Sequence, residues 1–541
     1  MRQWLGSWTP SVGALVIAIC FTGSAAAHVE PADLDRLGKV DFKVGCSDPA
    51  QQGFNRAMSL YHSFAWPQAM AAFDAVLNAD PACGMAHWGR AMTTLDNPFV
   101  WPANLPAQKL ADISAMLEAA RTAGLKTERE KGYVEAVGAF VRDREKLDHR
   151  ARLGAFDVEM AKLAAANPDD KEAAILSALV TSANFNPADK TYANQLKAAR
   201  ALEPLFNSLP NHPGVAHYLI HSYDYPPIAK YGLAAAKAYA KIAPGATHAL
   251  HMPSHIFTRL GYWRESIAAN LASAKAATET VFDGHHAHDY MVYAHLQLAQ
   301  DSAARQAMNQ SLARKPVDHF AAAYAYAAMP ARLALERSAW KDAASLALQP
   351  SADVYLWTKY PQAEAVNAFA RGIGAARSND PRLAREQHAR LVTLRDVAKE
   401  AKLGYWAEQI DIQATLVVAL ASCAESKPDI CVEGLRQAAA REDATEKHVV
   451  TPGPIVPARE LLAETLLTIA RKPADALKEY EAVLAKEPNR YRAVTGAMYA
   501  ARQIGDRQKA RAMARDLLKL GGKSGAGRFS LGQARLIVAS R

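Results

Sequence analysis

Two stretches far apart in the chain share one helical pattern. WPQAMAAFDAVLNADP begins at Trp66 and KPADALKEYEAVLAKEP begins at Lys472. Each has a small residue, an aromatic residue, a valine and a proline at successive spacings of 4, 3 and 5: Ala69, Phe73, Val76 and Pro81 in the first, and Ala476, Tyr480, Val483 and Pro488 in the second. Residues three and four apart share one face of a helix, and proline ends it. A recurring unit of this kind predicts stacked helical repeats.

This pattern resembles the tetratricopeptide repeat (TPR), in which a small residue, an aromatic residue and a helix-ending proline recur with a period of about 34 residues. Pro210 and Pro244 are one such period apart, and RLGYWRESIAAN, with Gly261 at its turn, resembles the turn and second helix of such a unit. The resemblance covers residues near 50–100, 180–345 and 465–520. It implies an all-α fold, a right-handed superhelix of stacked antiparallel helix pairs. For the poorly matched stretches 100–180 and 380–460, unrelated helical bundles remain an alternative. The chain also resembles exported bacterial TPR proteins of unsettled function.

Composition agrees with a globular helical protein. Of the 541 residues, 50% are hydrophobic and 22% are charged, and the helix formers alanine and leucine dominate. The net charge is +9, but lysine and arginine are scattered rather than gathered in a basic arm. We therefore expect no nucleic acid as a partner.

The first residues are typical of a secretory signal. A positive charge in MRQW precedes the short apolar run VGALVIAICF, and small residues up to Ala27 offer a cleavage site. We predict a signal peptide over residues 1–27 and an exported protein, periplasmic or associated with the cell envelope. An uncleaved anchor is the alternative. No later segment is apolar enough to cross a membrane.

The mature chain is divided into three expected regions. Residues 28–180 form an N-terminal helical region with a TPR-like unit near 50–100. Residues 181–345 form central TPR-like repeats with a histidine-rich groove. Residues 346–541 form a C-terminal helical region that ends in TPR-like repeats.

The cysteines that remain after cleavage are even in number, which favours disulfides in an exported chain. They are Cys46, Cys83, Cys423 and Cys431. Three pairings are possible. We favour the local one, Cys46 with Cys83 and Cys423 with Cys431.

Histidines recur with the period of the repeat. His217 and His221 are one helical turn apart, and His251 and His255 repeat that pair one period later. The resemblance places them at equal positions on successive first helices, which line the concave groove. Neighbouring helix axes lie about 8–10 Å apart, so the four imidazoles can reach a common centre. Ten of the 17 histidines fall between residues 212 and 295.

Further residues join this candidate site. His248 and Asp224 lie on the same stripes as the two pairs, and the helix HDYMVYAHLQLAQ, after a predicted linker FDGHHAHD, has His288 and His295 at the spacing of His248 and His255. We therefore predict eight metal-ligating residues: His217, His221, Asp224, His248, His251, His255, His288 and His295. Arg332 takes the place of His255 on the next helix, and together with Tyr218 it is predicted to line the groove and bind a ligand.

Imidazoles paired at i and i+4 favour a divalent transition metal such as zinc, copper or iron. A metal-handling role and a catalytic role, with a small molecule at the metal, both stay open. Motifs of zinc proteases, phosphate loops and serine hydrolases are absent from the sequence, so an enzymatic activity is not assigned. The alternative is a periplasmic scaffold that docks a protein or peptide in the TPR groove without metal.

The helical sequence pattern is interrupted from Glu446 onward by a proline-rich stretch, EKHVVTPGPIVPARELLAE. It predicts a rigid extended segment. Such a segment is either a lid that brings Glu446 or His448 to the groove or a plain loop between repeats.

Overall fold

The computed structural model describes residues 36–100, 105–277, 282–522 and 527–540. Throughout these residues the secondary structure is helical, with no strand. The predicted signal peptide lies outside them. Among the described helices, none is both long enough and apolar enough to cross a membrane.

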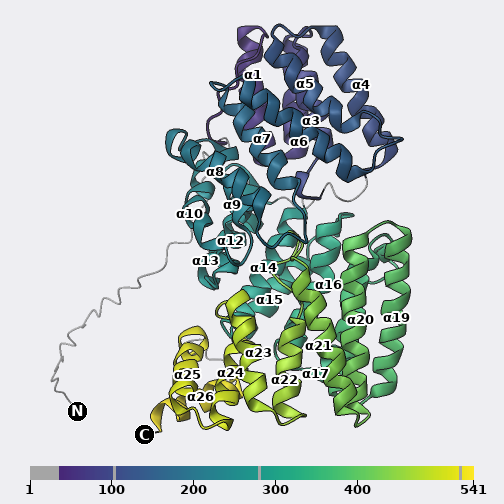
Figure 1. Cartoon of the computed structure of the whole chain (residues 1–541), viewed down its shortest axis with the longest axis vertical. Coiled ribbons are helices and arrows are strands. Elements are labelled where there is room, and N and C mark those ends of the chain that lie inside the picture. Colours follow the sequence, from purple (N-terminus) through teal and green to yellow (C-terminus); the bar gives the residue numbers. More distant parts are fainter. Residues whose placement is uncertain (1–35, 101–104, 278–281, 523–526, 541) are drawn as a thin grey trace, which may run out of the picture.

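The N-terminal helices form the upper part of Figure 1. Consecutive helices pack on one another as pairs, for example α1 on α2 and α5 on α6. Their bounds are α1 (Asp48–His62), α2 (Trp66–Ala79), α3 (Gly84–Leu95), the 3-10 turn η2 (Pro98–Val100), α4 (Ala107–Ala123), α5 (Glu128–Val141), α6 (His149–Ala166), α7 (Lys171–Ala183) and α8 (Ala193–Ser208).

The central helices carry the histidine-rich part of the chain. Several of them are short, and α11 and α12 follow one another with only Met252 between them. Their bounds are α9 (Pro213–Tyr223), η3 (Ala229–Gly232), α10 (Leu233–Ile242), α11 (Thr247–His251), α12 (Pro253–Arg259), α13 (Trp263–Ala276), α14 (Phe282–Gln297), α15 (Asp301–Leu312), α16 (Phe320–Leu335) and α17 (Trp340–Ala344).

The C-terminal helices continue the stack and form the lower part of Figure 1. The longest of them, α19 and α20, lie side by side. Their bounds are η4 (Trp357–Lys359), α18 (Pro361–Arg377), α19 (Pro381–Glu400), α20 (Gly404–Ala424), α21 (Pro428–Ala444), α22 (Ala458–Thr468), α23 (Pro473–Lys486), α24 (Tyr491–Gln503), α25 (Arg507–Gly521) and α26 (Phe529–Ala539).

Helix contacts are mostly local in sequence, as a solenoid requires. Each helix packs on its chain neighbour, and several also pack on the next helix but one, such as α14 on α16 and α18 on α20. The contact of α14 with α24 is one of those that bridge distant parts of the chain. The predicted fold class, an all-α stack of helix pairs, is confirmed.

The small and aromatic residues of the repeat pattern allow neighbouring helices to pack closely. Ala69, Phe73 and Val76 of α2 are buried, and so are Ala476, Tyr480 and Val483 of α23. In both units a glycine of the following helix lies under the aromatic ring. A Cβ atom on Gly89 would come within 2.2 Å of Phe73, and one on Gly496 within 2.0 Å of Tyr480. A larger residue at either glycine would push the two helices apart.

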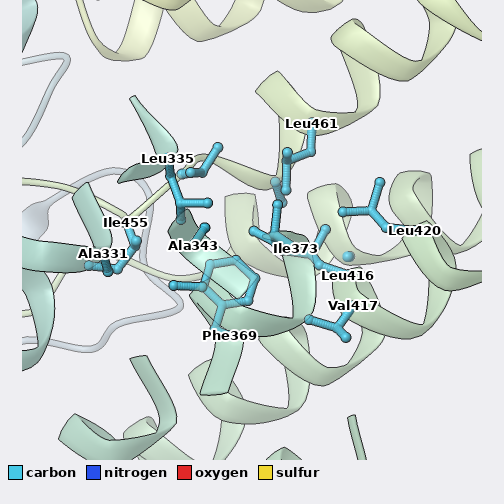
Figure 2. Packing of buried hydrophobic residues seen from close by; sticks show 14 of the residues in the cluster. Ala331, Leu335, Ala343, Phe369, Ile373, Leu416, Val417, Leu420, Ile455 and Leu461 are labelled. Atoms are coloured by element: carbon cyan, nitrogen blue, oxygen red, sulfur yellow. The ribbon is translucent and has the colours of Figure 1, made fainter. Parts of the chain in front are cut away.

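Buried apolar side chains fill the space between the stacked helices. Figure 2 shows this packing around Phe369 and Ile373 of α18, with Leu416 and Leu420 of α20 beside them. A buried ion network adds to it where α24 begins: the guanidinium of Arg490 donates to Glu336 and Glu460, all three wholly or almost wholly buried.

Both disulfides have the local pairing favoured above. Cys46 bonds to Cys83, with Cα atoms 5.0 Å apart, and Cys423 bonds to Cys431, with Cα atoms 5.2 Å apart. The first ties the segment before α1 to the start of α3, and the second joins α20 to α21.

Candidate metal centre

Six histidines of the central helices gather into two groups of three. In each group, one ring nitrogen from every member lies within 4.8 Å of the other two. The first group, called here trio A, is His217, His221 and His248. The second, trio B, is His251, His255 and His286.

Trio A joins helix α9 to helix α11. The Nε2 atom of His217 lies 3.1 Å from Nε2 of His221, one turn along α9, and 3.2 Å from Nε2 of His248. His217 and His221 are buried and His248 is partly buried.

Trio B is built by α11, α12 and α14. The Nε2 atoms of His251 and His255 are 3.0 Å apart, and the ring of His286 lies 4.4 Å from that of His251. Pro253 separates α11 from α12 because it has no N–H to give to the helix ladder. Met252 keeps helical dihedrals (φ −52°, ψ −35°), so His251 and His255 still lie one turn apart on one face.

In three of the histidines, the Nδ1 atom donates a hydrogen bond to an oxygen atom. Nδ1 of His251 lies 2.6 Å from Oδ1 of Asn270, whose amide nitrogen donates to the carbonyl of Ser266. Nδ1 of His255 lies 2.9 Å from Oδ2 of Asp224. Nδ1 of His217 lies 2.7 Å from the carbonyl oxygen of His62. Because carbonyl and carboxylate oxygens only accept, each Nδ1 holds the proton and each Nε2 presents a bare lone pair.

Two bare lone pairs 3.0 Å apart cannot form a hydrogen bond. They repel each other unless a cation lies between them. Tetrahedral coordination with metal–nitrogen bonds of about 2.0–2.1 Å places ligand nitrogens about 3.3 Å apart. The Nε2 atom of His217 lies close to this distance from those of His221 and His248, and so does Nε2 of His251 from that of His255.

Burial keeps these rings neutral. Desolvation is the largest cause that lowers the pKa of every one of the six, and that of His251 falls to about 3. Neighbouring imidazoles lower these pKa values further, except that of His255, where Asp224 opposes burial. At neutral pH the lone pairs are therefore free to bind a metal. Nδ1 of His286 is buried with no hydrogen-bond partner in the part of the chain that the structure describes.

Aromatic rings pack against both trios. Phe99 stacks on His221 at 3.9 Å between ring centroids, and Phe64 stacks on His248 at 5.4 Å. Tyr290 of α14 packs against His251 and His255, and its hydroxyl lies 3.4 Å from Nε2 of His255. Tyr290 therefore borders trio B.

Asp224, predicted as a ligand, lies behind the site instead. Its carboxylate accepts hydrogen bonds from His255, from Nε of Arg259 at 2.8 Å and from Nζ of Lys447 at 3.0 Å. These cations hold the pKa of Asp224 well below its usual range. The side chain orients His255 rather than facing the ligand nitrogens.

His288 and His295 also lie apart from the two trios. Nδ1 of His288 donates to the carbonyl of Gly284, and Nδ1 of His295 lies 2.7 Å from Oε1 of Gln300. The expected linker FDGHHAHD is helical, since α14 begins at Phe282. His286, which the sequence reasoning placed in that linker, is the residue that reaches trio B. It follows His251 by close to one repeat period, a spacing that would have identified it.

The predicted groove residues are buried among internal partners. Tyr218 lies with its hydroxyl 2.8 Å from Nδ1 of His62. Arg332, with no exposed surface, donates to Asp289, to Thr451 and to the carbonyls of Gly453 and Pro454. The 445–457 segment, which connects α21 to α22, thus occupies the place expected for a ligand.

This segment touches the site through a residue that the sequence did not single out. Lys447 reaches Asp224, whereas Glu446 pairs with Lys190 and His448 packs against Trp406. Nothing in the sequence marks Lys447, because Asp224 is 223 residues away.

A third group of possible ligands behaves differently. His62, Glu172 and His212 also lie close together, but their hydrogen bonds are complete. Both histidines donate from Nε2 to Glu172, at 3.0 and 2.7 Å, and their Nδ1 atoms accept from Tyr218 and from the backbone N–H of Val215. This group is a closed hydrogen-bond network that supports α9 and leaves no lone pair for a metal.

Comparison with solved structures finds helical repeat proteins. The TPR domain of P58(IPK) matches with 13% identity over 85% of this chain and 99% of that chain, at a TM-score of 0.21. A circular tandem repeat protein with novel repeat topology matches with 12% identity over 90% of this chain and 98% of that chain, at a TM-score of 0.13. At such TM-scores these likenesses carry no argument about a ligand. No protein-family model matches the sequence, and neither does a curated protein.

Proposed function

We propose that this protein binds transition-metal ions through the imidazoles of trios A and B. The observation that carries the proposal is the pair formed by His251 and His255, whose Nε2 atoms are 3.0 Å apart while Asn270 and Asp224 hold both Nδ1 protons. Imidazole nitrogen suits zinc, copper, iron and nickel, and three such nitrogens leave a position for water or a small molecule. Both a metal-handling and a catalytic role fit such a centre.

Export is part of the proposal. Two disulfides, Cys46–Cys83 and Cys423–Cys431, are typical of proteins that fold in an oxidising compartment, and the first residues have the composition of a signal peptide. Periplasm or cell envelope is therefore the proposed location.

The alternative, a scaffold that docks a peptide in the groove, has less support. Arg332 and Tyr218 have no exposed surface. The 445–457 segment already covers the region, with its carbonyl groups bonded to Arg332. A peptide would have to displace a part of the chain that is well hydrogen-bonded.

Two neighbouring histidines of α14 provide a matched test. His286 belongs to trio B, whereas His285, also buried, turns the other way toward Ser311 and Lys315. Protein without an affinity tag is stripped with chelator, incubated with zinc, copper, iron or nickel, and desalted before elemental analysis. We expect wild type and H285A to retain at least one metal ion per chain and H286A to retain less. A chain that binds none of the four metals contradicts the proposal.

A further inference from the structure

Trios A and B are parts of one cluster. The rings of His221 and His255 have centroids 6.1 Å apart, and so do the rings of His248 and His251. Two rings of trio A therefore each lie next to a different ring of trio B. Ions bound in both would be near neighbours, as in two-metal sites, where the ions are about 3.5–4 Å apart.

The ligand set narrows the choice of metal. All six members are imidazoles, and the nearby carboxylate of Asp224 is already bonded to His255, Arg259 and Lys447. Dinuclear iron and manganese centres in helical proteins use glutamates together with histidines, and the hard ions magnesium and calcium take oxygen ligands. An all-imidazole set favours copper, zinc or nickel.

The charge of the surrounding side chains favours one of these three metals. Among the charged side chains that act most strongly on the six rings are one anion, Asp224, and two cations, Arg259 and Lys447. All three are buried. Because the nearby Glu446 is paired with Lys190, these three side chains give the surroundings of the rings a net positive charge before any metal binds. Two divalent ions would add four more charges to a buried site with no anionic ligand, which is costly. Two copper(I) ions would add only two positive charges, whereas zinc and nickel bind as divalent ions.

We propose that trios A and B together hold a pair of copper ions, three imidazoles to each ion, and that the site favours the reduced, monovalent pair. The inference rests on the proposed metal binding and extends it to stoichiometry, metal and oxidation state. Oxidation by an external one-electron acceptor removes one electron from each copper. The oxidised pair then needs added anions, such as hydroxide from solvent, to balance its charge.

The test begins with an anaerobic titration of the metal-free, untagged chain with copper(I) against a chromogenic copper(I) chelator. We expect two equivalents to bind in wild type and in H285A, and one equivalent in either H248A or H286A, since each variant leaves the other trio intact. The loaded protein is then oxidised with ferricyanide, two molecules of which take one electron each. Coupling between the two copper(II) ions should leave less than half of the copper visible by electron paramagnetic resonance.

A second arm tests the charge argument. Lys447→Met removes one of the two cations while Arg259 continues to pair with Asp224. The midpoint potential of the bound copper should fall relative to wild type, whereas Lys519→Met, which removes an exposed lysine paired with Asp516 on α25, should leave it unchanged. An unchanged or higher potential in Lys447→Met overturns the charge argument.

The outcomes distinguish this inference from the proposed function. One copper equivalent in wild type, or the full resonance intensity of isolated copper(II), overturns the paired centre. Binding of zinc that copper(I) cannot displace overturns the choice of metal. In these cases metal binding itself still stands. A chain that binds no metal overturns both.

Discussion

The Nε2 atom of His251 lies 3.0 Å from the Nε2 atom of His255, and neither atom has a proton to donate. The reason is on the far side of each ring, where Asn270 and Asp224 each accept an Nδ1 proton. The two lone pairs repel each other in the metal-free protein, and this repulsion destabilises its fold. A cation bound between the lone pairs removes this repulsion, so metal binding should also stabilise the folded state.

Asn270 fixes the tautomer of His251, so its loss should weaken metal binding without removing a ligand. In Asn270→Ala, Nδ1 of His251 loses its acceptor and the ring is free to place its proton on Nε2. Loss of such a partner typically costs about 10–100-fold in metal affinity, and we expect a decrease of that size in a competition titration. Asn367→Ala is the control, because Asn367 is also buried but bonds to Leu346. Equal affinities in the two variants would show that Asn270 does not orient His251.

Arg332 should anchor the 445–457 segment. Arg332→Met removes four hydrogen bonds and leaves Asp289 buried without its partner. Breaking a buried ion pair from one side costs about 3–5 kcal/mol, and the freed segment should become a site of protease cleavage. Limited proteolysis with mass spectrometry and urea unfolding measure the two effects.

The control for Arg332 is Arg385→Met. Arg385 pairs with Glu425 at an exposed position, where an ion pair contributes about 0–1 kcal/mol. If both variants lose the same stability and resist protease equally, Arg332 does not hold the segment.

Asp283 should make stability depend on pH. Burial raises the pKa of its carboxyl group to about 6 from 3.8, although Thr247 donates a hydrogen bond to it. The protonated form is thus favoured in the folded state. Its stabilising effect is fully present below pH 3.8 and is lost as the pH rises through about 6. In Asp283→Asn this loss is absent, so the variant should be more stable than wild type by about 3 kcal/mol at pH 8 and by about half as much at pH 5. Thermal unfolding at both pH values measures it, and a difference independent of pH contradicts the assignment.

The two disulfides should contribute unequally to the free energy of unfolding. Cys46–Cys83 closes a loop with a sequence separation of 37 and Cys423–Cys431 one with a separation of 8. Loop-closure entropy then gives about 4 kcal/mol for the first and about 2.5 kcal/mol for the second. Urea unfolding of the double serine variant of each pair tests the order. Equal losses would indicate that loop length does not set the contribution.

The helical periodicity predicted the stacked fold because it is a local property of the chain. The period of the repeat also pointed to His217, His221, His251 and His255, which do gather in the structure. These four were expected to share one centre, whereas in the structure they lie in two groups of three, which are completed by His248, also among the predicted ligands, and by His286, which was not.

The remaining features of the site depend on tertiary contacts. His286 was missed because FDGHHAHD was interpreted as a linker, whereas packing on α13 and α16 makes it helical. Asn270 and Lys447 reach the site from other parts of the chain, and the repeat spacing of the histidines does not include them. Asp224 was expected among the ligands because it shares a stripe with His221, but Arg259 and Lys447 draw it to the outer side of His255.

The most direct test of the central claim is anomalous X-ray diffraction from crystals of the copper-loaded protein, collected on either side of the copper absorption edge. The account predicts two peaks, one about 2 Å from a ring nitrogen of each member of trio A and one in the same relation to trio B. Peaks confined to surface histidines, or trios that hold no anomalous density, would contradict it.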